Sequence, residues 1–158
     1  MIDTGKVKFN VRPFDRLNDI ACVFATWCHY IRRSEPFNRM DPDEFRHHKR
    51  TVIERLVARH PPTMAVHEAH PNQILAWCCC DPKRNALHFL FAKEWVREKG
   101  VGKALLKFEL PWFLRKKIYY THRSKATPFL ERRWDMCYNP YLVMKCDESQ
   151  LSELSTLL

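Results

Sequence analysis

The sequence predicts a single α+β domain, spanning residues 1–158, in which helices pack against a mixed, mostly antiparallel central sheet. Three observations lead to this prediction. The length of 158 residues is that of one domain. Short segments that alternate polar and apolar residues are interspersed with segments of helical periodicity. The predicted order, β-α-α-β-β-β-α-β-α-β, lacks the regular alternation of strand and helix that a doubly wound parallel sheet requires.

The N-terminal part contains one strand and two helices. Alternating residues predict a strand over residues 6–12, and apolar residues spaced three or four apart predict a helix over residues 15–33. A second helix is predicted over residues 41–60. Asp41 can cap that helix and Pro42 fits its first turn.

The middle of the chain is rich in strands. Residues 63–68, 73–80 and 86–92 are short β-type segments separated by sequences typical of turns. They fit an antiparallel meander. The last of them, ALHFLFA, is almost wholly apolar, so we expect it in the centre of the sheet.

The C-terminal part is predicted to return to alternating helices and strands. A helix over residues 101–114 is expected to end or kink at Pro111. The further predicted elements are a strand over 117–122, a short basic helix over 126–134, a final strand over 140–146, and a weak helix or loose tail over 149–158.

The charge is concentrated in one part of the chain. The whole sequence has a net charge of +9, and residues 93–133 alone contain 12 basic and 4 acidic residues, a net +8. A solvated surface would scatter its charge, so this concentration indicates an anionic partner. Nucleic acid and a small polyphosphate cofactor both fit.

Several classes of protein are not indicated. No segment approaches the roughly 20 apolar residues of a membrane span, and the N-terminus lacks the apolar core of a signal peptide. The seven cysteines include no C-x-x-C pair. We therefore expect a cytoplasmic protein with free thiols, no membrane contact and no metal site.

One motif has a clear physical interpretation. Gly100 and Gly102, two of the three glycines, lie between the apolar strand and the next helix. Glycine lets the backbone approach an anion closely, and the first turn of a helix presents unpaired N–H groups to it. Arg97, Lys99 and Lys103 add positive charge. Alternatively, Gly100 only caps an element and the charges are solvated.

The motif is not a P-loop, because no Gly-Lys-Ser/Thr sequence follows. The Rossmann fingerprint is also excluded, because a third glycine and a parallel βαβ unit are missing. Arg97-x-x-Gly100-x-Gly102, between a strand and a helix, instead resembles the acyl-CoA-binding motif of the GNAT N-acetyltransferase superfamily. The element order over residues 7–145 is also similar to that fold.

Smaller similarities accompany the motif. Residues 11–14 (VRPF) are similar to the opening strand and turn of many members, and residues 126–133 resemble the helix beside the pantetheine arm. The Tyr-Thr-His strand end at residues 120–122 and the segment 139–141 are similar to those of small phage-encoded members.

The resemblance implies that residues 86–92 and 117–122 splay apart and that acetyl-CoA lies in the opening. The backbone near Ala92 would hold the pantetheine and thioester, and Phe129 would line the pantetheine. The N–H groups of residues 99–103 would hold the pyrophosphate, and Lys125, Arg132 or Arg133 would reach the 3′-phosphate. The implied cofactor-binding residues are Ala92, Arg97, Lys99, Gly100, Val101, Gly102, Lys103 and Phe129.

The resemblance also bears on catalysis. In many members a Tyr in the helix after the second splayed strand protonates the leaving thiolate, and Leu130 falls at that position here. His122, at a strand end beside the opening, has an intrinsic pKa suited to a general base. Glu94 is a second candidate base, acting through a water. Other possible proton donors are Tyr120, Tyr138 and Tyr141.

The acceptor site is expected near the end of the first helix, because the first two helices wall that site in the resembling fold. The predicted acceptor-binding residues are Trp27, Tyr30 and Arg32. Trp27 also fits a core position on the apolar stripe of its helix. The region 27–39 carries both Arg and acidic residues, so it excludes neither an acidic nor a basic acceptor.

The sequence thus predicts an N-acyltransferase that moves an acetyl group from acetyl-CoA directly to an amine. One alternative is a GNAT-fold module that binds CoA or a partner without turnover, as Leu130 would allow. The other is a basic protein that binds or modifies nucleic acid. That alternative requires aromatic and basic side chains interleaved on one exposed sheet face, and Tyr119 and Tyr120 beside basic residues are compatible with it.

Overall fold

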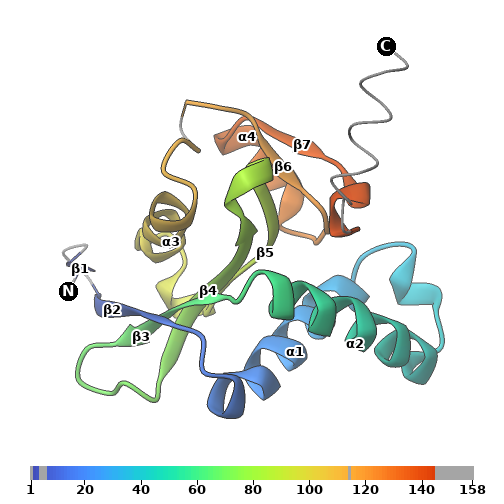
Figure 1. Ribbon diagram of the computed structural model, residues 1–158, viewed down its shortest axis with the longest axis horizontal. Helices are drawn as coiled ribbons and strands as arrows, with labels where there is room; N and C mark the ends of the chain where they lie inside the picture. Colours follow the sequence, from blue (N-terminus) through green and yellow to red (C-terminus); the bar gives the residue numbers. More distant parts are fainter. Residues whose placement is uncertain (1, 4–6, 114, 145–158) are drawn as a thin grey trace.

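The computed structural model describes residues 2–3, 7–113 and 115–144 of the chain. Its centre is a seven-stranded sheet whose strands follow one another in sequence order (Figure 1). Neighbouring strands are antiparallel from β1 to β5, and the β5–β6 and β6–β7 pairs are parallel. The predicted α+β class with a mixed sheet is confirmed. The strands are β1 (Ile2–Asp3), β2 (Lys8–Pro13), β3 (Thr63–His67), β4 (Ile74–Asp81), β5 (Ala86–Ala92), β6 (Ile118–Tyr120) and β7 (Met136–Tyr138).

Helices cover both faces of this sheet. Helices α1 and α2 lie side by side on one face, and α3 packs against the other (Figure 1). Among the described helices, none is both long and apolar enough to cross a bilayer. The helices are α1 (Arg16–Arg32), α2 (Pro42–Arg59), α3 (Val101–Glu109) and α4 (Thr127–Arg133), with 3-10 turns η1 (Phe37–Arg39), η2 (Pro82–Arg84), η3 (Glu94–Val96) and η4 (Pro140–Val143).

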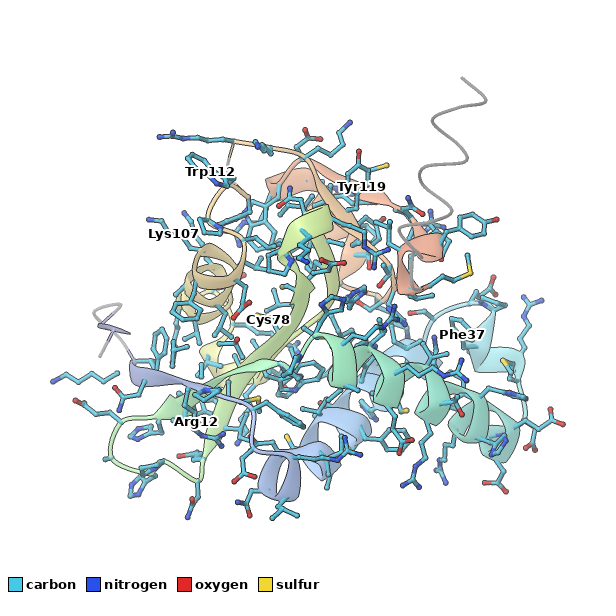
Figure 2. All side chains as sticks on the ribbon, viewed as in Figure 1. Arg12, Phe37, Cys78, Lys107, Trp112 and Tyr119 are labelled. Atoms are coloured by element: carbon cyan, nitrogen blue, oxygen red, sulfur yellow. The ribbon has the colours of Figure 1, made fainter. Side chains whose placement is uncertain are left out.

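Two apolar cores lie on opposite faces of the sheet. Leu105 of α3 belongs to one core, and Trp27 of α1 belongs to the other. Along β4, Trp77 and Cys79 face the α1–α2 core, whereas Cys78 faces the α3 core (Figure 2). Strand alternation therefore separates the adjacent cysteines, as strand geometry requires.

A β-bulge in β5 interrupts this alternation. The pairing with β4 shifts between Leu87 and Phe89, so that His88 is the extra residue. Leu87 faces the α3 core and Phe89 faces the α1–α2 core. The ring centroids of His88 and His60 lie 5.4 Å apart, and His60 directly follows α2. His88 and Phe89 therefore share the α1–α2 side, and bulges commonly redirect side chains in this way next to functional sites.

The C-terminal strand differs from the prediction. In place of a strand over residues 140–146, the structure forms β7 earlier in the chain, and Pro140–Val143 is the turn η4. The side chain of Asn139 accepts a hydrogen bond from the backbone N–H of Tyr141 at 3.2 Å. With Pro140 in the first position, this cap favours a helical turn over a strand. The predicted tail, 149–158, lies outside the described residues.

Helix α3 is shorter than the predicted 101–114. It ends at Glu109, and Leu110 is its C-terminal cap. Leu110 precedes Pro111, and the residue before a proline is driven away from helical backbone angles. The prediction that Pro111 ends the helix is confirmed.

A buried ion pair joins the end of β2 to the start of α1. Arg12 donates two hydrogen bonds, of 2.7 and 2.8 Å, to the carboxylate of Asp19 (Figure 2). The backbone N–H of Asp15 donates a third, at 2.8 Å. Burial raises the pKa of Asp19, but these hydrogen bonds and the charge of Arg12 outweigh it and lower the pKa below its ordinary value. The ionised pair therefore fixes how α1 leaves the sheet.

Replacing Asp19 by Asn should reduce the free energy of unfolding by about 1.5–3 kcal/mol, the range for hydrogen bonds to charged groups. Because the folded pKa of Asp19 is lowered, its contribution is present at neutral pH and is lost as the pH falls through that pKa. Urea denaturation at pH 7 measures the loss. Glu35→Gln, which removes an exposed pair with Arg39, is the control and should cause no measurable change. Equal effects of the two variants would contradict the role given to Asp19.

Candidate active site

The hydrogen-bonded pairing between β5 and β6 covers only the start of β5. Its last residue pair is Leu87 with Tyr120, after which the N–H of Thr121 donates to the carbonyl of Leu87 at 3.2 Å. Strand β5 then continues to Ala92, whereas the chain after Thr121 turns into the segment that leads to α4. The implied splay of these two strands is confirmed.

The open edge of β5 carries backbone hydrogen-bonding groups. The N–H of Lys93 donates to the carbonyl of Leu75 in β4 at 2.9 Å, whereas the carbonyl of Ala92 accepts from Nε of Arg97 at 3.1 Å. Backbone groups alternate between the two sides of a strand. The N–H of Ala92 and both backbone groups of Leu90 therefore face the opening.

A cavity of about 590 Å³ occupies this opening. Four segments form its walls: the C-terminal end of α1, the second half of β5, the turn into α3, and the region from Ser124 to Trp134 that includes α4. Its lining residues are Tyr30, Arg33, Phe89, Leu90, Phe91, Ala92, Val96, Arg97, Glu98, Gly100, Gly102, Lys103, Ser124, Lys125, Ala126, Phe129, Leu130, Arg133 and Trp134. The volume is that of a site for an extended small molecule.

The turn into α3 brings backbone N–H groups to the cavity. Gly100, with a φ of 82°, adopts a left-handed conformation that favours glycine, and it precedes the first helical residue, Val101. The first N–H groups of a helix lack intrahelical acceptors. A Cβ placed on Gly102 would lie 3.5 Å from the side chain of Leu90, an ordinary van der Waals contact, so the start of α3 lies directly against β5.

The charges around the cavity are almost all positive. Its lining contains five cations and, among the described lining residues, a single carboxylate, that of Glu98. The cations are Arg33, Arg97, Lys103, Lys125 and Arg133. Several cations around one hollow create a field that attracts a polyanion.

Most residues implied to bind the cofactor lie at this cavity. Six line it: Ala92, Arg97, Gly100, Gly102, Lys103 and Phe129. Lys99 does not, because its ammonium group lies over the ring of Trp95, 5.4 Å from the centroid. The side chain of Val101 is buried in the α3 core, so only its backbone is available to a ligand. Arg33 and Leu90 are lining residues that sequence reasoning missed.

The predicted acceptor residues are not together. Tyr30 lines the cavity, and its hydroxyl accepts from Arg97 at 2.8 Å, which ties α1 to the end of β5. Trp27 is instead a core residue: it is 0% exposed and stacks on Phe89 at 5.2 Å. Arg32 lies outside the cavity lining, and Arg33 takes its place. The apolar spacing of Trp27 already indicated its core position.

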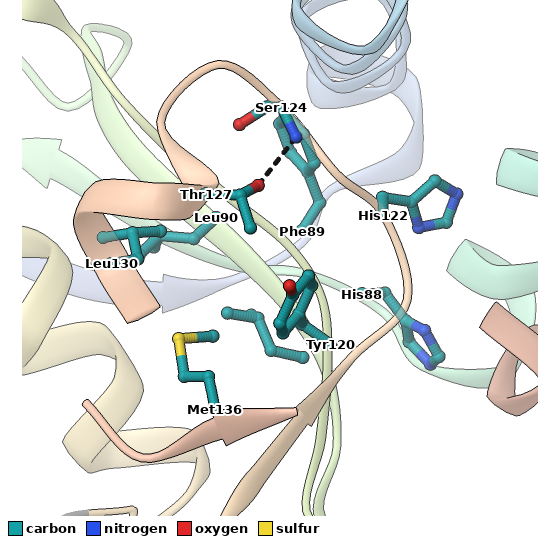
Figure 3. Close-up of a pocket in the computed structure, with 10 residues that line it drawn as sticks. His88, Phe89, Leu90, Tyr120, His122, Ser124, Thr127, Leu130 and Met136 are labelled. Atoms are coloured by element: carbon teal, nitrogen blue, oxygen red, sulfur yellow. Dashed lines mark hydrogen bonds between the residues drawn. The ribbon is translucent and has the colours of Figure 1, made fainter. Parts of the chain in front are cut away.

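His122 lies beside a second, much smaller void. The residues that line this void of about 30 Å³ are shown in Figure 3. Phe89, Leu90, Ser124 and Leu130 also line the larger cavity, so the two adjoin. The ring of His122 meets Trp27 edge-on, with centroids 5.2 Å apart. Burial, and then the nearby positive charge of Lys49, lower the pKa of His122 well below its ordinary value. His122 is therefore neutral at neutral pH, as a base must be.

A hydrogen-bonded chain continues from His122. Its Nδ1 lies 2.8 Å from the hydroxyl of Thr121, and the same hydroxyl lies 3.0 Å from Nδ1 of His88. His88 and His122 point to the same side of the strands (Figure 3). Burial lowers the pKa of His88 to about 4. Sequence reasoning missed His88, although a lone polar residue within ALHFLFA was a usable signal.

Comparison with known proteins bears on the fold. Neither a protein-family model nor a curated protein matches the sequence. Among solved structures, the chain is similar to a proposed acetyl transferase from Pyrococcus furiosus, with a TM-score of 0.53 and 19% identity over 80% of this chain and 91% of that one. The chain has the GNAT fold. It also matches apo-form YjaB from Escherichia coli, with a TM-score of 0.47 and 19% identity. That match covers 66% of each chain, so this chain spans just under two thirds of the length of YjaB.

None of the three tyrosines predicted as possible proton donors lines the larger cavity. Leu130 lines both cavities and carries no ionisable proton. Burial, together with a hydrogen bond from its hydroxyl to Glu131, raises the pKa of Tyr120 to about 12. Neither Tyr138 nor Tyr141 lines either cavity.

The other candidate base, Glu94, is exposed in η3 and lines neither cavity. His122 is therefore the better-placed of the two. Within the described ranges, no three His, Cys, Asp or Glu side chains gather closely enough to hold a metal ion.

Buried His88 should make the fold sensitive to mild acid. Its folded pKa of about 4 lies below the ordinary 6.5, so between these values the unfolded chain binds more protons and stability falls as the pH falls. From pH 7 to pH 5 the free energy of unfolding should fall by about 2 kcal/mol because of His88. In His88→Leu, the loss of stability over that interval should be smaller by about this amount.

Urea denaturation at the two pH values measures the difference, and His48→Gln, at an exposed position of α2, is the control. If the free energy of unfolding falls as much between pH 7 and pH 5 in His88→Leu as in the wild type, His88 is not buried in its neutral form.

Gly102 offers a test of the cavity that leaves the fold intact. The Cβ of Gly102→Ala would make only an ordinary contact with Leu90, whereas the side chain of Gly102→Trp would extend into the cavity. We expect Gly102→Trp to weaken CoA binding about tenfold or more and Gly102→Ala to preserve it, with little change in thermal midpoint for either.

Calorimetric titration with CoA and thermal unfolding provide the two readouts. Gly100 is unsuitable for this test, because its positive φ makes any side chain there strain the backbone. Undiminished binding by Gly102→Trp would exclude the cavity as the CoA site.

Proposed function

We propose that the protein transfers an acetyl group from acetyl-CoA to an amine in the opening between β5 and β6. The observation that carries this proposal is the cavity of about 590 Å³, which joins an unpaired strand edge, a glycine-containing helix start and five cations. A polyanionic cofactor with a long polar arm matches all three features. The GNAT fold of the chain supports the same cofactor.

The cofactor would lie along the cavity in two parts. The pantetheine amides would pair with the carbonyl of Leu90 and the N–H of Ala92, in the manner of an added strand. The pyrophosphate would receive the N–H groups at the start of α3, where the helix dipole favours negative charge. Lys103, Lys125 and Arg133 would add charge-assisted hydrogen bonds, each worth about 1.5–3 kcal/mol.

The chemistry requires an amine nucleophile without its extra proton. His122 is neutral and lines the small void that adjoins the cavity. As the amine nitrogen attacks the thioester carbonyl, Nε2 of His122 would take the nitrogen's proton. The backbone N–H of Leu90, a residue that lines both the cavity and the small void, would stabilise the carbonyl oxygen as it becomes negative. Collapse of the intermediate breaks the C–S bond, and the thiolate of CoA leaves and takes a proton from water.

The acceptor amine would approach from the α1–α2 side. His122 and His88 point to that side of the strands (Figure 3), and Tyr30 and Arg33 of this side line the end of the cavity. The hydrogen bond from Arg97 fixes the hydroxyl of Tyr30 there. Tyr30 and Arg33 would therefore position the acceptor.

One observation favours a second candidate function. Leu130 occupies the place of the usual acid, and the raised pKa of Tyr120 makes it a poor substitute. A module that binds CoA without turnover fits these two facts. The nucleic-acid alternative gains no such support, because β6 and β7, which carry the exposed Tyr119 and Tyr138, are each only three residues long.

Release of CoA thiol from acetyl-CoA, measured with a panel of small-molecule and peptide amines, separates these candidates. An acetyltransferase releases thiol in step with an acetylated amine. His122→Ala should then reduce the rate about 100-fold or more, with acetyl-CoA affinity unchanged, whereas His48→Ala should have no effect. Because the pKa of His122 is lowered, the wild-type rate should persist below pH 6.5 before it declines.

Saturable binding of acetyl-CoA without thiol release for any amine would support the binding module. A full rate in His122→Ala would remove His122 from the reaction.

A further inference from the structure

A line of polar side chains runs from His122 away from the cavity. The hydroxyl of Thr121 lies between Nδ1 of His122, at 2.8 Å, and Nδ1 of His88, at 3.0 Å. The ring of His88 lies 5.4 Å from that of His60, and Nε2 of His60 lies 3.5 Å from a carboxylate oxygen of Asp81. The line therefore connects the predicted base, His122, with the His60–Asp81 pair at the C-terminal end of β4.

The inner part of this line is shielded from water. Thr121 is 3% exposed and His88 is 1% exposed. The bulge in β5 turns His88 toward this side of the sheet. Within the part of the chain that the structure describes, Nε2 of His88 has no hydrogen-bond partner. An unpaired polar atom this deeply buried is costly and is uncommon in proteins.

A single hydroxyl between two imidazoles couples their protons. A threonine hydroxyl has one proton to donate, so it can donate to one Nδ1 and accept from the other. For His122 to act as a base through Nε2, its own proton must lie on Nδ1, which donates to Thr121. Thr121 then donates to Nδ1 of His88, and His88 carries its proton on Nε2.

We infer that Thr121 and His88 form a proton relay that holds His122 in its basic tautomer and removes the proton taken from the amine. The inference rests on the proposed acetyl transfer. When Nε2 of His122 binds the amine proton, the proton on Nδ1 moves to the oxygen of Thr121, and the hydroxyl proton moves to Nδ1 of His88. His88 then releases its Nε2 proton toward His60, and one proton has crossed the site.

Burial and the surrounding charges keep the relay free of an extra proton between turnovers. Burial, with His60, Arg84 and Arg59 opposing Asp81, lowers the pKa of His88 to about 4. At pH 7 the ring of His88 is therefore protonated in only about one molecule in a thousand. Lys49 of α2 acts in the same direction on His122. A proton that enters the relay is thus passed on instead of being retained.

The outer end of the relay reaches solvent. The side chain of His60 is 20% exposed and faces Asp81, which Arg84 holds by a hydrogen bond of 2.5 Å. Burial and the adjacent arginines lower the pKa of His60 despite the opposing charge of Asp81. One water molecule between the rings of His88 and His60 would complete the path, and waters commonly bridge polar groups at such separations.

The decisive variant is Thr121→Val, which removes the hydroxyl and keeps the shape of the side chain. With the amine that gives the fastest thiol release, we expect kcat to fall about 10-fold to 100-fold, with the KM for acetyl-CoA unchanged. Thr121→Ser restores a hydroxyl and should recover a large part of the rate. Thr51→Val, at an exposed position of α2, is the matched control.

Imidazole ¹⁵N spectra at pH 7 give a readout that does not depend on turnover. In the wild type, His122 should carry its proton on Nδ1 and His88 on Nε2, and Thr121→Val should abolish this complementary pattern. If the wild type shows no complementary tautomers, the inference is overturned even where acetyl transfer is found. If the tautomer pattern is found but no amine is acetylated, the hydrogen-bonded arrangement of His122, Thr121 and His88 is supported and the proposed function is refuted.

His88→Leu distinguishes the relay from a simpler arrangement in which Thr121 alone fixes the tautomer of His122. A relay predicts that His88→Leu lowers kcat about as much as Thr121→Val does, and that the solvent deuterium isotope effect on the wild-type rate is reduced in both variants. Full activity in His88→Leu, with Thr121→Val impaired, would contradict proton transfer beyond Thr121.

Discussion

The early end of the pairing between β5 and β6 is the constraint on which the site depends. While Leu87 and Tyr120 are paired, the sheet is continuous and its two cores are separate. After Thr121 the strands part, and β5 is left with an unpaired edge beside an open cavity. An unpaired edge is normally a liability that proteins cover. Here the gap supplies backbone donors and acceptors for a ligand, and it connects the two faces of the sheet.

The two sides of this opening have different electrostatic characters. The cavity on the α3–α4 side is lined by exposed cationic side chains, which suit a polyphosphate. On the α1–α2 side, burial and neighbouring cations lower the pKa values of His122 and His88, so these rings are neutral. Positive charge thus serves binding on one side and keeps a base unprotonated on the other.

Sequence patterns predicted the elements that depend on local chemistry. The caps and prolines around α2 and the two glycines at the start of α3 located those helices closely. Patterns failed where long-range pairing decides the outcome. Strand β7 forms over Met136–Tyr138 because β6 is available as its partner, whereas the apolar segment after Asn139 has no strand partner among the described residues. The motif located the cavity wall at residues 97–103, but Arg33 comes from a distant helix that no local pattern connects to it. His88 is a similar case, since its contact with Thr121 depends on a bulge and on a strand 33 residues away.

Titration of the wild-type protein with acetyl-CoA by calorimetry, at low and at moderate salt, tests the central claim most directly. We predict saturable binding with a stoichiometry near one, which weakens as salt rises because the cations at the cavity are exposed. Absence of binding at both salt concentrations would contradict the assignment of the opening between β5 and β6 as a cofactor site.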